Sequence, residues 1–262
     1  MKYSQEELLL MEPEKVYELI LNGSIYGFPK GFFKEKNPEK TDKYARLIRY
    51  LIEEKLHWSD EEICKNLTKD IFYEYYLSGM LQSIFSNSPY KVIENTYPGK
   101  FRPWELSIVP RNYWNKENAR EAIVWLIEEK LRCTDEEIYM KISADIFIKN
   151  GLGYMLMKIF NGSPYKALNT VYPGKFKPWL FNTTPRNYWN KENAREAIVW
   201  LIEEKLKWSY TDICEKITME VFIENGLGGM IQTVFDGSIY EALNNAYPGK
   251  FVKVKNKIQV KK

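Results

Sequence analysis

Residues 110–131 read PRNYWNKENAREAIVWLIEEKL, and the same 22 residues return unchanged at 185–206. A shorter phrase marks a third copy, because Tyr-Pro-Gly-Lys-Phe begins at Tyr97, Tyr172 and Tyr247, a spacing of 75 residues each time. A fixed period of this length is typical of tandem-repeat proteins, in which one module presents the same kind of surface several times. Positions held across the copies are therefore predicted to be scaffold, and exposed positions that vary are candidates for recognition.

The repeated stretch has the apolar period of an α-helix. Asn115 is a predicted N-cap, and a wide apolar stripe follows it at Ala119, Ala122, Ile123, Leu126 and Ile127. Capping-box pairs begin the next helix in every copy, at Ser59/Glu62, Thr134/Glu137 and Ser209/Asp212. We predict an all-α fold, an elongated array of three tandem 75-residue helical modules without strands, each similar to a helix-turn-helix.

The repeat sets the expected domain boundaries. Residues 1–28 are predicted to be an N-terminal half-repeat or cap, because Asn22 to Tyr26 echo Asp236 to Tyr240. The three repeats are then predicted at 29–104, 105–180 and 181–252, followed by a basic tail at 253–262 that we expect to be mobile.

Signals of catalysis, metal binding and membrane insertion are absent from the sequence. Its one histidine, His57, aligns with Arg132 and Lys207, and no phosphate loop, HExxH motif or nucleophile elbow occurs. Three cysteines without CxxC spacing predict neither a zinc site nor a disulfide framework. No apolar run approaches the roughly 20 residues of a membrane span. We expect a cytoplasmic protein that is not an enzyme and has no cofactor or metal and no membrane association.

The net charge of +3 is unevenly distributed. Residues 250–262 contain six lysines and no acid, so the remaining residues 1–249 sum to −3. A nucleic-acid hypothesis must therefore depend on where the charge lies rather than on its total.

Basic and aromatic residues alternate in the connectors between modules. Such a pattern suits phosphate contacts and base stacking, and the tryptophans involved are Trp104, Trp114, Trp179 and Trp189. In the alternative interpretation, these tryptophans pack one module onto the next. The predicted phosphate-binding residues are Lys100, Arg102, Arg111, Lys175, Lys177, Arg186, Lys250 and Lys253.

A short helix, a glycine-rich turn and a second helix occur in each module. The second helix of a helix-turn-helix can lie in the major groove of DNA. Its outward positions differ between copies, which fits base reading and equally fits free drift of solvated positions. The candidates for base reading are Gln82, Ser83, Met157, Lys158, Gln232 and Thr233.

The segment Phe160-Asn-Gly-Ser-Pro-Tyr-Lys-Ala-Leu168 resembles the Phe-Gly-Ser-Trp-x-x-Ala-Leu signature of homing-endonuclease-associated repeats. That resemblance implies small helical DNA-binding modules, although this module is longer and carries an extra residue before Gly162. The chain also resembles an uncharacterised bacterial and phage family of tandem repeats that carry the phrase Tyr-Pro-Gly-Lys-Phe-x-Pro-Trp. This second resemblance covers nearly the whole chain but implies no function.

Together these features predict a non-catalytic protein that binds double-stranded DNA, as a regulator or an accessory protein of a mobile element. The alternative is a scaffold or inhibitor that binds another protein through the repeat array, which the acidic sum over residues 1–249 favours. A third hypothesis, binding of single-stranded RNA, would use the aromatic residues for stacking.

Overall fold

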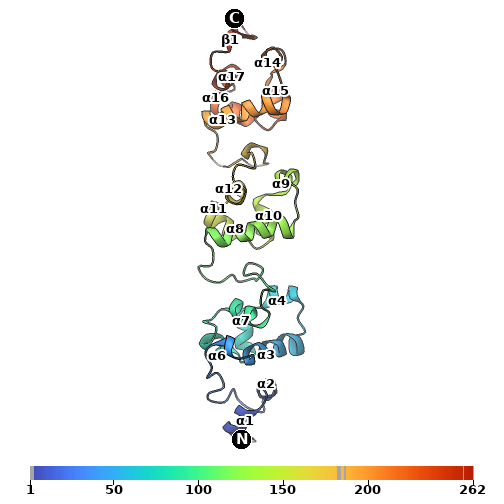
Figure 1. The fold of residues 1–262 in the computed structure, drawn as a ribbon, viewed down its shortest axis with the longest axis vertical. Helices are drawn as coiled ribbons and strands as arrows, with labels where there is room; N and C mark the ends of the chain where they lie inside the picture. The colour runs from blue at the N-terminus through green and yellow to red at the C-terminus, as the bar shows by residue number, and fades with distance from the viewer. Residues whose placement is uncertain (1–2, 182–183, 186, 256, 262) are drawn as a thin grey trace. The chain divides into compact units, whose positions relative to one another are not determined.

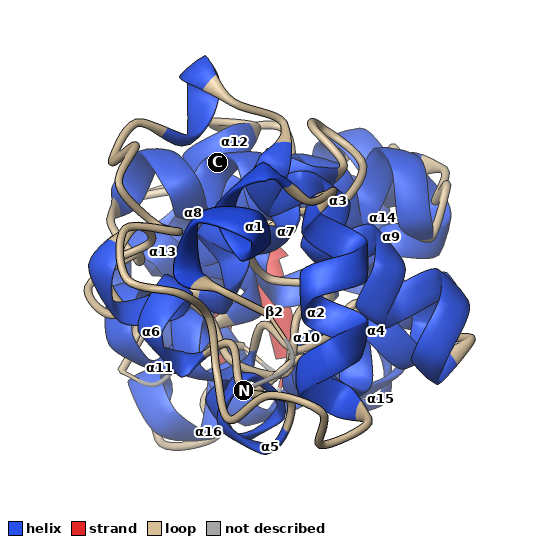
Figure 2. Cartoon of the chain, turned by 90° about the horizontal axis from the view of Figure 1, so that it is seen from below, coloured by secondary structure: helices blue, strands red, loops and turns tan. Residues whose placement is uncertain are grey.

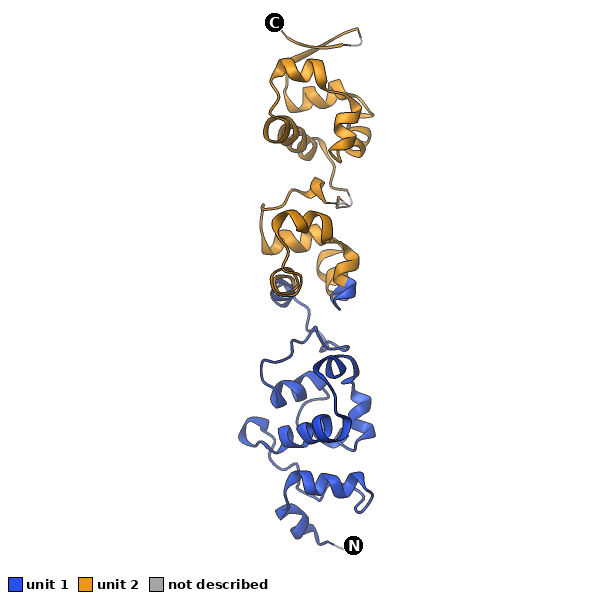
Figure 3. Cartoon of the chain, turned by 90° about the vertical axis from the view of Figure 1, so that its right-hand side faces the viewer, with its two compact units in different colours: residues 1–122, 148–154 blue, residues 123–147, 155–262 orange. Residues whose placement is uncertain are grey.

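The computed structural model describes residues 3–181, 184–185, 187–255 and 257–261. It divides into two compact units, residues 1–122 with 148–154 and residues 123–147 with 155–262, which Figure 3 colours separately. The boundary runs through the second repeat, and we describe each unit by itself. No helix among the described residues is both long and apolar enough to cross a membrane.

The regular structure of the described chain is almost entirely helical, and irregular connectors join the helices, as Figures 1 and 2 show. Residues up to the end of the first repeat form α1 (Gln5–Leu10), α2 (Pro13–Leu21), a 3-10 turn (Pro38–Lys40), α3 (Lys43–Arg49), a π-helix (Tyr50–Leu56), α4 (Asp60–Asn66), α5 (Lys69–Glu74), α6 (Ser78–Ser83) and α7 (Pro89–Thr96). The second repeat forms α8 (Lys116–Val124), a π-helix (Trp125–Lys130), α9 (Asp135–Lys141), α10 (Ala144–Lys149), α11 (Gly153–Phe160), α12 (Pro164–Val171) and a 3-10 turn (Pro178–Leu180). The third forms α13 (Lys191–Val199), a π-helix (Trp200–Leu206), α14 (Tyr210–Lys216), α15 (Met219–Glu224), α16 (Gly228–Phe235) and α17 (Ile239–Ala246), followed by β1 (Phe251–Val254) and β2 (Lys257–Val260).

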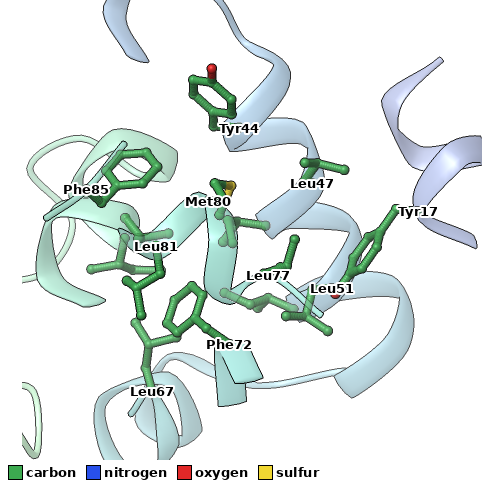
Figure 4. Packing of buried hydrophobic residues seen from close by; sticks show 14 of the residues in the cluster. Tyr17, Tyr44, Leu47, Leu51, Leu67, Phe72, Leu77, Met80, Leu81 and Phe85 are labelled. Atoms are coloured by element: carbon green, nitrogen blue, oxygen red, sulfur yellow. The ribbon is translucent and has the colours of Figure 1, made fainter. Parts of the chain in front are cut away.

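In each repeat an α-helix continues directly into π-helical turns, and we call the two together the long helix; in the first repeat it is α3 with residues 50–56. The core of the first repeat forms between this long helix and the α5–α6 pair. Figure 4 shows Leu77 and Met80 beside Leu51 and Leu47, with Phe72 in the same cluster, and all five side chains are at most 1% exposed. The third repeat has an equivalent core in which Phe222, Leu227 and Met230 are fully buried. The predicted apolar stripe is thus the inward face of the long helix, as helical spacing requires.

The N-terminal helices join the same core as the first repeat. Tyr17 of α2 is fully buried, and its hydroxyl donates a hydrogen bond to the carbonyl of Tyr75 at 2.8 Å. Arg46 of α3 forms ion pairs with Glu12 and Glu14, the latter at 2.6 Å. The segment before the first repeat is therefore attached to it by both apolar and charged contacts.

The long helix ends in the same way in all three repeats. Its last turns are π-helical. A residue with a left-handed backbone follows directly at His57 (φ 53°) and Lys207 (φ 54°), and one residue later, after Leu131, at Arg132 (φ 49°). The next N–H closes the end by donating to a carbonyl six residues back, as Trp58 does to Ile52 at 3.0 Å. The positive charges of Arg132 and Lys207 at this position complement the negative end of the helix dipole.

The predicted capping boxes are confirmed in all three repeats. The backbone N–H groups of Ser59, Thr134 and Ser209 donate to the carboxylates of Glu62, Glu137 and Asp212 at 2.8, 3.0 and 2.9 Å. Reciprocal bonds from the carboxylate residues' N–H groups to the capping hydroxyls measure 3.2–3.3 Å. Asn115 is also confirmed as an N-cap, because its side chain accepts the N–H of Asn118 at 2.9 Å.

These caps predict a loss of stability in acid. Hydrogen bonds from the backbone and hydroxyl of Ser59 lower the pKa of Glu62. The pKa of Glu137 is lowered first by Lys141 and then by the backbone of Thr134. The pKa of Asp212 is lowered first by Lys216 and then by Ser209. When the pKa of a carboxyl group is lower in the folded state than in the unfolded state, the group stabilises the fold at any pH above its unfolded pKa, which is about 4. This stabilisation is lost as the pH falls through the folded-state pKa. We therefore expect the Tm to fall as pH decreases below about 4.5.

The matched control removes the titration and keeps the cap. Replacing Glu62 and Glu137 by Gln and Asp212 by Asn retains a carbonyl oxygen as acceptor. The triple variant should show a flatter decline of Tm between pH 6 and pH 3 in thermal unfolding followed by circular dichroism. An equally steep decline would assign the acid sensitivity to other carboxylates.

The prediction that the basic tail is mobile is wrong for most of its length. β1 and β2 pair antiparallel, with Val252 opposite Gln259 and Lys253 opposite Ile258, and strands are red in Figure 2, where β2 is labelled. The β-branched residues of this segment suit an extended pair, and Ile258 packs against the core of the third repeat. The six lysines obscured this pattern, because charge composition says little about local backbone preference.

Candidate binding surfaces

The recurring phrase Tyr-Pro-Gly-Lys forms a turn that is fixed to the long helix. Gly99 and Gly174 have φ values of 70° and 71°, as the third residue of a type II turn requires. The Tyr97 hydroxyl donates to Glu53 at 2.6 Å, and Tyr172 donates to Glu128 at 2.7 Å. Burial, and then the hydrogen bond to Glu53, raise the pKa of Tyr97 and keep it a donor. These invariant residues are scaffold, as the repeat comparison predicted.

Two of the predicted phosphate-binding lysines have partners within the chain. Lys100 Nζ lies 2.6 Å from Asp60 Oδ1, and Lys175 Nζ lies 2.7 Å from Asp135 Oδ1. The aspartates begin α4 and α9, so each ion pair joins the turn to the start of a helix. A phosphate would have to compete with a carboxylate at both lysines.

The third repeat departs from this arrangement. Tyr210 replaces the aspartate, and Lys250 Nζ lies 6.0 Å from the centre of the Tyr210 ring. Among the described residues Lys250 has no carboxylate within ion-pair distance. Its charge is therefore available to a partner in a way that the charges of the other two lysines are not.

The other predicted phosphate ligands are scattered over the connectors. Arg102 is half-buried and Arg111 is exposed. Lys177 lies 3.7 Å from Glu204 and over the Trp179 ring. Lys253 is exposed on β1, and Arg186 lies outside the described residues. Phosphate binding by these residues stays a prediction.

The connector tryptophans pack inside the protein. Trp104, Trp114 and Trp179 are only 4%, 6% and 2% exposed, whereas Trp189 is half-buried. The rings of Trp104 and Trp114 lie 6.2 Å apart, and that of Trp179 lies 5.9 Å from that of Trp200. Trp104, Trp114 and Trp179 therefore offer no face on which a base could stack, and the packing alternative holds for them.

The backbone of two connector tryptophans lies close to the glycine turn between the paired helices. A Cβ on Gly151 would lie 3.1 Å from the Trp104 carbonyl oxygen, and one on Gly226 would lie 3.6 Å from that of Trp179. Both glycines have left-handed backbones, with φ values of 76° and 73°. In the first repeat, Tyr76 occupies the same position with φ 60°, and no connector tryptophan precedes that repeat. The close approach of a tryptophan carbonyl therefore favours glycine at position 151, whereas at Gly226 the contact is an ordinary one and the positive φ favours glycine.

The six base-reading candidates are all exposed on the second helix of each pair. Several of their polar groups are engaged nearby. Gln82 Nε2 donates to the Tyr73 hydroxyl at 2.9 Å. The hydroxyls of Ser83 and Thr233 donate to backbone carbonyls of their own helices at 2.7 Å. All six side chains are accessible to solvent. The hydroxyl groups of Ser83 and Thr233, however, already donate their only proton within the helix.

Sequence reasoning missed an exposed apolar position on the first helix of each pair. Tyr73, Ile148 and Ile223 are spaced by the repeat period and are 53%, 62% and 61% exposed. A Cβ on Gly228 would lie 2.6 Å from Ile223 Cγ1, so the isoleucine lies over the glycine of the following helix. The available signal was an apolar residue directly after each buried phenylalanine, outside the inward stripe.

The three helix pairs lie within residues 69–87, 144–162 and 219–237. Taken together, they contain more acidic than basic residues. Residues 69–87 contain one lysine and two acids, and residues 219–237 contain three acids and no basic residue. Residues 144–162 contain two lysines and one acid, so the three segments have net charges of −1, −3 and +1. Among the residues described, no group of three His, Cys, Asp or Glu is placed to hold a metal ion.

The repeat of this chain also occurs in a known protein family. No curated protein and no solved structure matches the chain. The family model "Protein of unknown function (DUF4046)" matches it three times in succession, over residues 14–102, 104–177 and 180–252. The chain is therefore a member of this family and contains three tandem copies of its repeat.

Proposed function

We propose that this chain is a non-catalytic binding protein whose repeats hold a protein partner through the apolar side chain beside each glycine turn. The carrying observation is the recurrence of Tyr73, Ile148 and Ile223 in exposed positions at the repeat period. One exposed apolar residue is ordinary on a protein surface. Three at the same position of three modules indicate a surface that each module presents to the same partner.

The charges around these residues favour a protein over DNA. The helix pairs sum to −3, and a duplex repels such a surface because it carries one negative charge per about 1.7 Å. Lys100 and Lys175, two of the eight residues expected to hold phosphates, already have carboxylate partners. A protein partner with apolar anchors flanked by basic residues matches the surface in both respects.

DNA reading by the same helices is the competing hypothesis. The likeness to homing-endonuclease-associated repeats supports it, as do the exposed Gln82, Lys158 and Gln232. In that hypothesis the second helix of a helix-turn-helix enters the major groove and the chain acts as a regulator or an accessory protein of a mobile element. The net charge of the helix pairs is the observation that weighs against it.

Site-specific photocrosslinking tests the proposal. A benzophenone side chain placed at position 73 or 223 should crosslink to the same protein in the native host, because both positions lie at equivalent contacts. A probe at the exposed Lys207, at the end of the long helix, should give no such product. Crosslinks from positions 73 and 223 to nucleic acid, or to nothing, would contradict the proposal.

The affinity of variants for the protein identified by crosslinking then measures how much Ile223 contributes to binding. Complete burial of an isoleucine side chain contributes about 1.5–3 kcal/mol, so Ile223→Ala should weaken binding by roughly tenfold or more. Thr211→Ala, at an exposed position of α14, should leave Kd unchanged. Isothermal titration of both variants measures the difference. Equal affinities would remove Ile223 from the interface.

A further inference from the structure

The segment after the third repeat concentrates positive charge on an ordered element. Residues 250–261, which we call the lysine hairpin, contain β1, β2 and no acidic residue. Five of their lysines are described and all are exposed: Lys250, Lys253, Lys255, Lys257 and Lys261. No carboxylate lies within ion-pair distance of any of the five among the residues described.

The hairpin is anchored to the third repeat rather than free. Phe251 is 2% exposed, and its ring lies 5.7 Å from that of Tyr210 and 6.1 Å from that of Tyr247. The backbone N–H of Lys261 donates to the carbonyl of Lys250 at 2.8 Å and closes the open end. β1 lies beside α17, at the C-terminal end in Figure 1, and β2 lies beside α14. A charged surface fixed in this way loses less conformational entropy on binding than a flexible tail.

The third repeat also lacks the acid that the first two repeats place beside this turn. Asp60 and Asp135 pair with Lys100 and Lys175, whereas Tyr210 stands beside Lys250. Glu215 of the adjoining α14 lines a groove together with Lys253 and Lys257 of the hairpin. Among the described residues Glu215 is the one acidic residue that lines this groove, and the hairpin itself has five lysines and no acid, so it stays strongly cationic.

We propose that the lysine hairpin binds the phosphate backbone of duplex nucleic acid. A two-stranded antiparallel pair fits the major groove of B-DNA, which is about 12 Å wide. Successive side chains of a strand point to opposite faces, so Lys253 lies on the face that carries Phe251, whereas Lys257, opposite Val254, lies on the other face. Lysines therefore flank the hairpin on both faces. Lysine is a point charge without a fixed hydrogen-bonding plane, so this contact is independent of base sequence.

A duplex fits the hairpin better than a single strand does. Single-strand binding depends on aromatic side chains that stack with bases. Phe251 is the only aromatic residue in the hairpin, and it is buried. The inference is independent of the proposed protein interface, because it concerns different residues.

Salt titration of the full chain on a random-sequence 20-bp duplex tests the inference. Five phosphate contacts predict a log–log slope of affinity against salt near −4.5, or about a 500-fold loss between 50 and 200 mM. Replacing Lys253, Lys255 and Lys257 by Gln should reduce the slope to about −1.8. The control removes the same charge elsewhere, at the exposed Lys65, Lys69 and Lys91, and should keep the steep slope.

A second variant tests the missing acid. Tyr210→Asp supplies the carboxylate that Lys100 and Lys175 already have, and should flatten the slope by about one unit. Ile223→Asp should leave duplex binding unchanged, which separates this proposal from the protein interface. Three outcomes would overturn the inference: no duplex binding at 50 mM salt, an unaltered slope in the hairpin triple variant, or stronger binding to single strands or anionic lipid vesicles than to the duplex.

Discussion

Replacing Phe222 by alanine should lower the free energy of unfolding by about 3–5 kcal/mol, because the ring is fully buried and its loss leaves a cavity. Phe72 and Phe147 occupy the same position in the other repeats and are also fully buried. In a tandem array the loss should fall chiefly on the repeat that carries the change and on its neighbour. Urea unfolding followed by circular dichroism measures the effect.

The neighbouring residue provides the matched control. Ile223 is 61% exposed, so Ile223→Ala should change the free energy of unfolding by less than about 0.5 kcal/mol. The pair of variants thus separates an inward residue from an outward one in adjacent positions. If both changes destabilised the protein equally, the assigned inner and outer faces of α15 would be wrong.

Replacing Trp179 by alanine should also lower the free energy of unfolding by about 3–5 kcal/mol. Trp179 is 2% exposed and packs against Trp189 and Trp200, so its removal empties the junction between a connector and the third repeat. Fluorescence during urea unfolding, which reports on the remaining tryptophans, measures this loss.

A phenylalanine at the same position should be tolerated better. The buried indole Nε1 of Trp179 has no hydrogen-bond partner among the described residues, and an unsatisfied buried donor costs about 1–3 kcal/mol. Trp179→Phe removes that donor and keeps much of the apolar surface. A loss as large as that of Trp179→Ala would show that the volume of the indole, rather than its polarity, determines the junction.

The exact repeat made much of the local structure predictable. The apolar stripe, the capping boxes and the type II turn at Pro173-Gly174 depend on residues three or four positions apart, and all are present. The prediction that held positions are scaffold is confirmed for Tyr97 and Tyr172, whose hydroxyls bind the long helix. The hairpin at residues 251–260 was missed, because its β-branched residues alternate with lysines that suggested a mobile tail.

The candidate surfaces were less predictable. The sequence drew attention to Lys100 and Lys175, but their aspartate partners lie 40 residues earlier in the chain, and no local pattern connects them. The sequence could not predict that Ile223 is exposed either, because a helix of six residues has too few positions to define its outward face from sequence.

The sequence by itself determined that this protein is a tandem helical repeat, because helix periodicity, caps and turns arise from interactions between near neighbours in the chain. Only the tertiary structure decided which charges and aromatic rings remain available to a partner. Ion pairing and burial depend on residues that folding brings together from distant positions. The same lysine is therefore paired beside Asp60 or Asp135 and unpaired beside Tyr210.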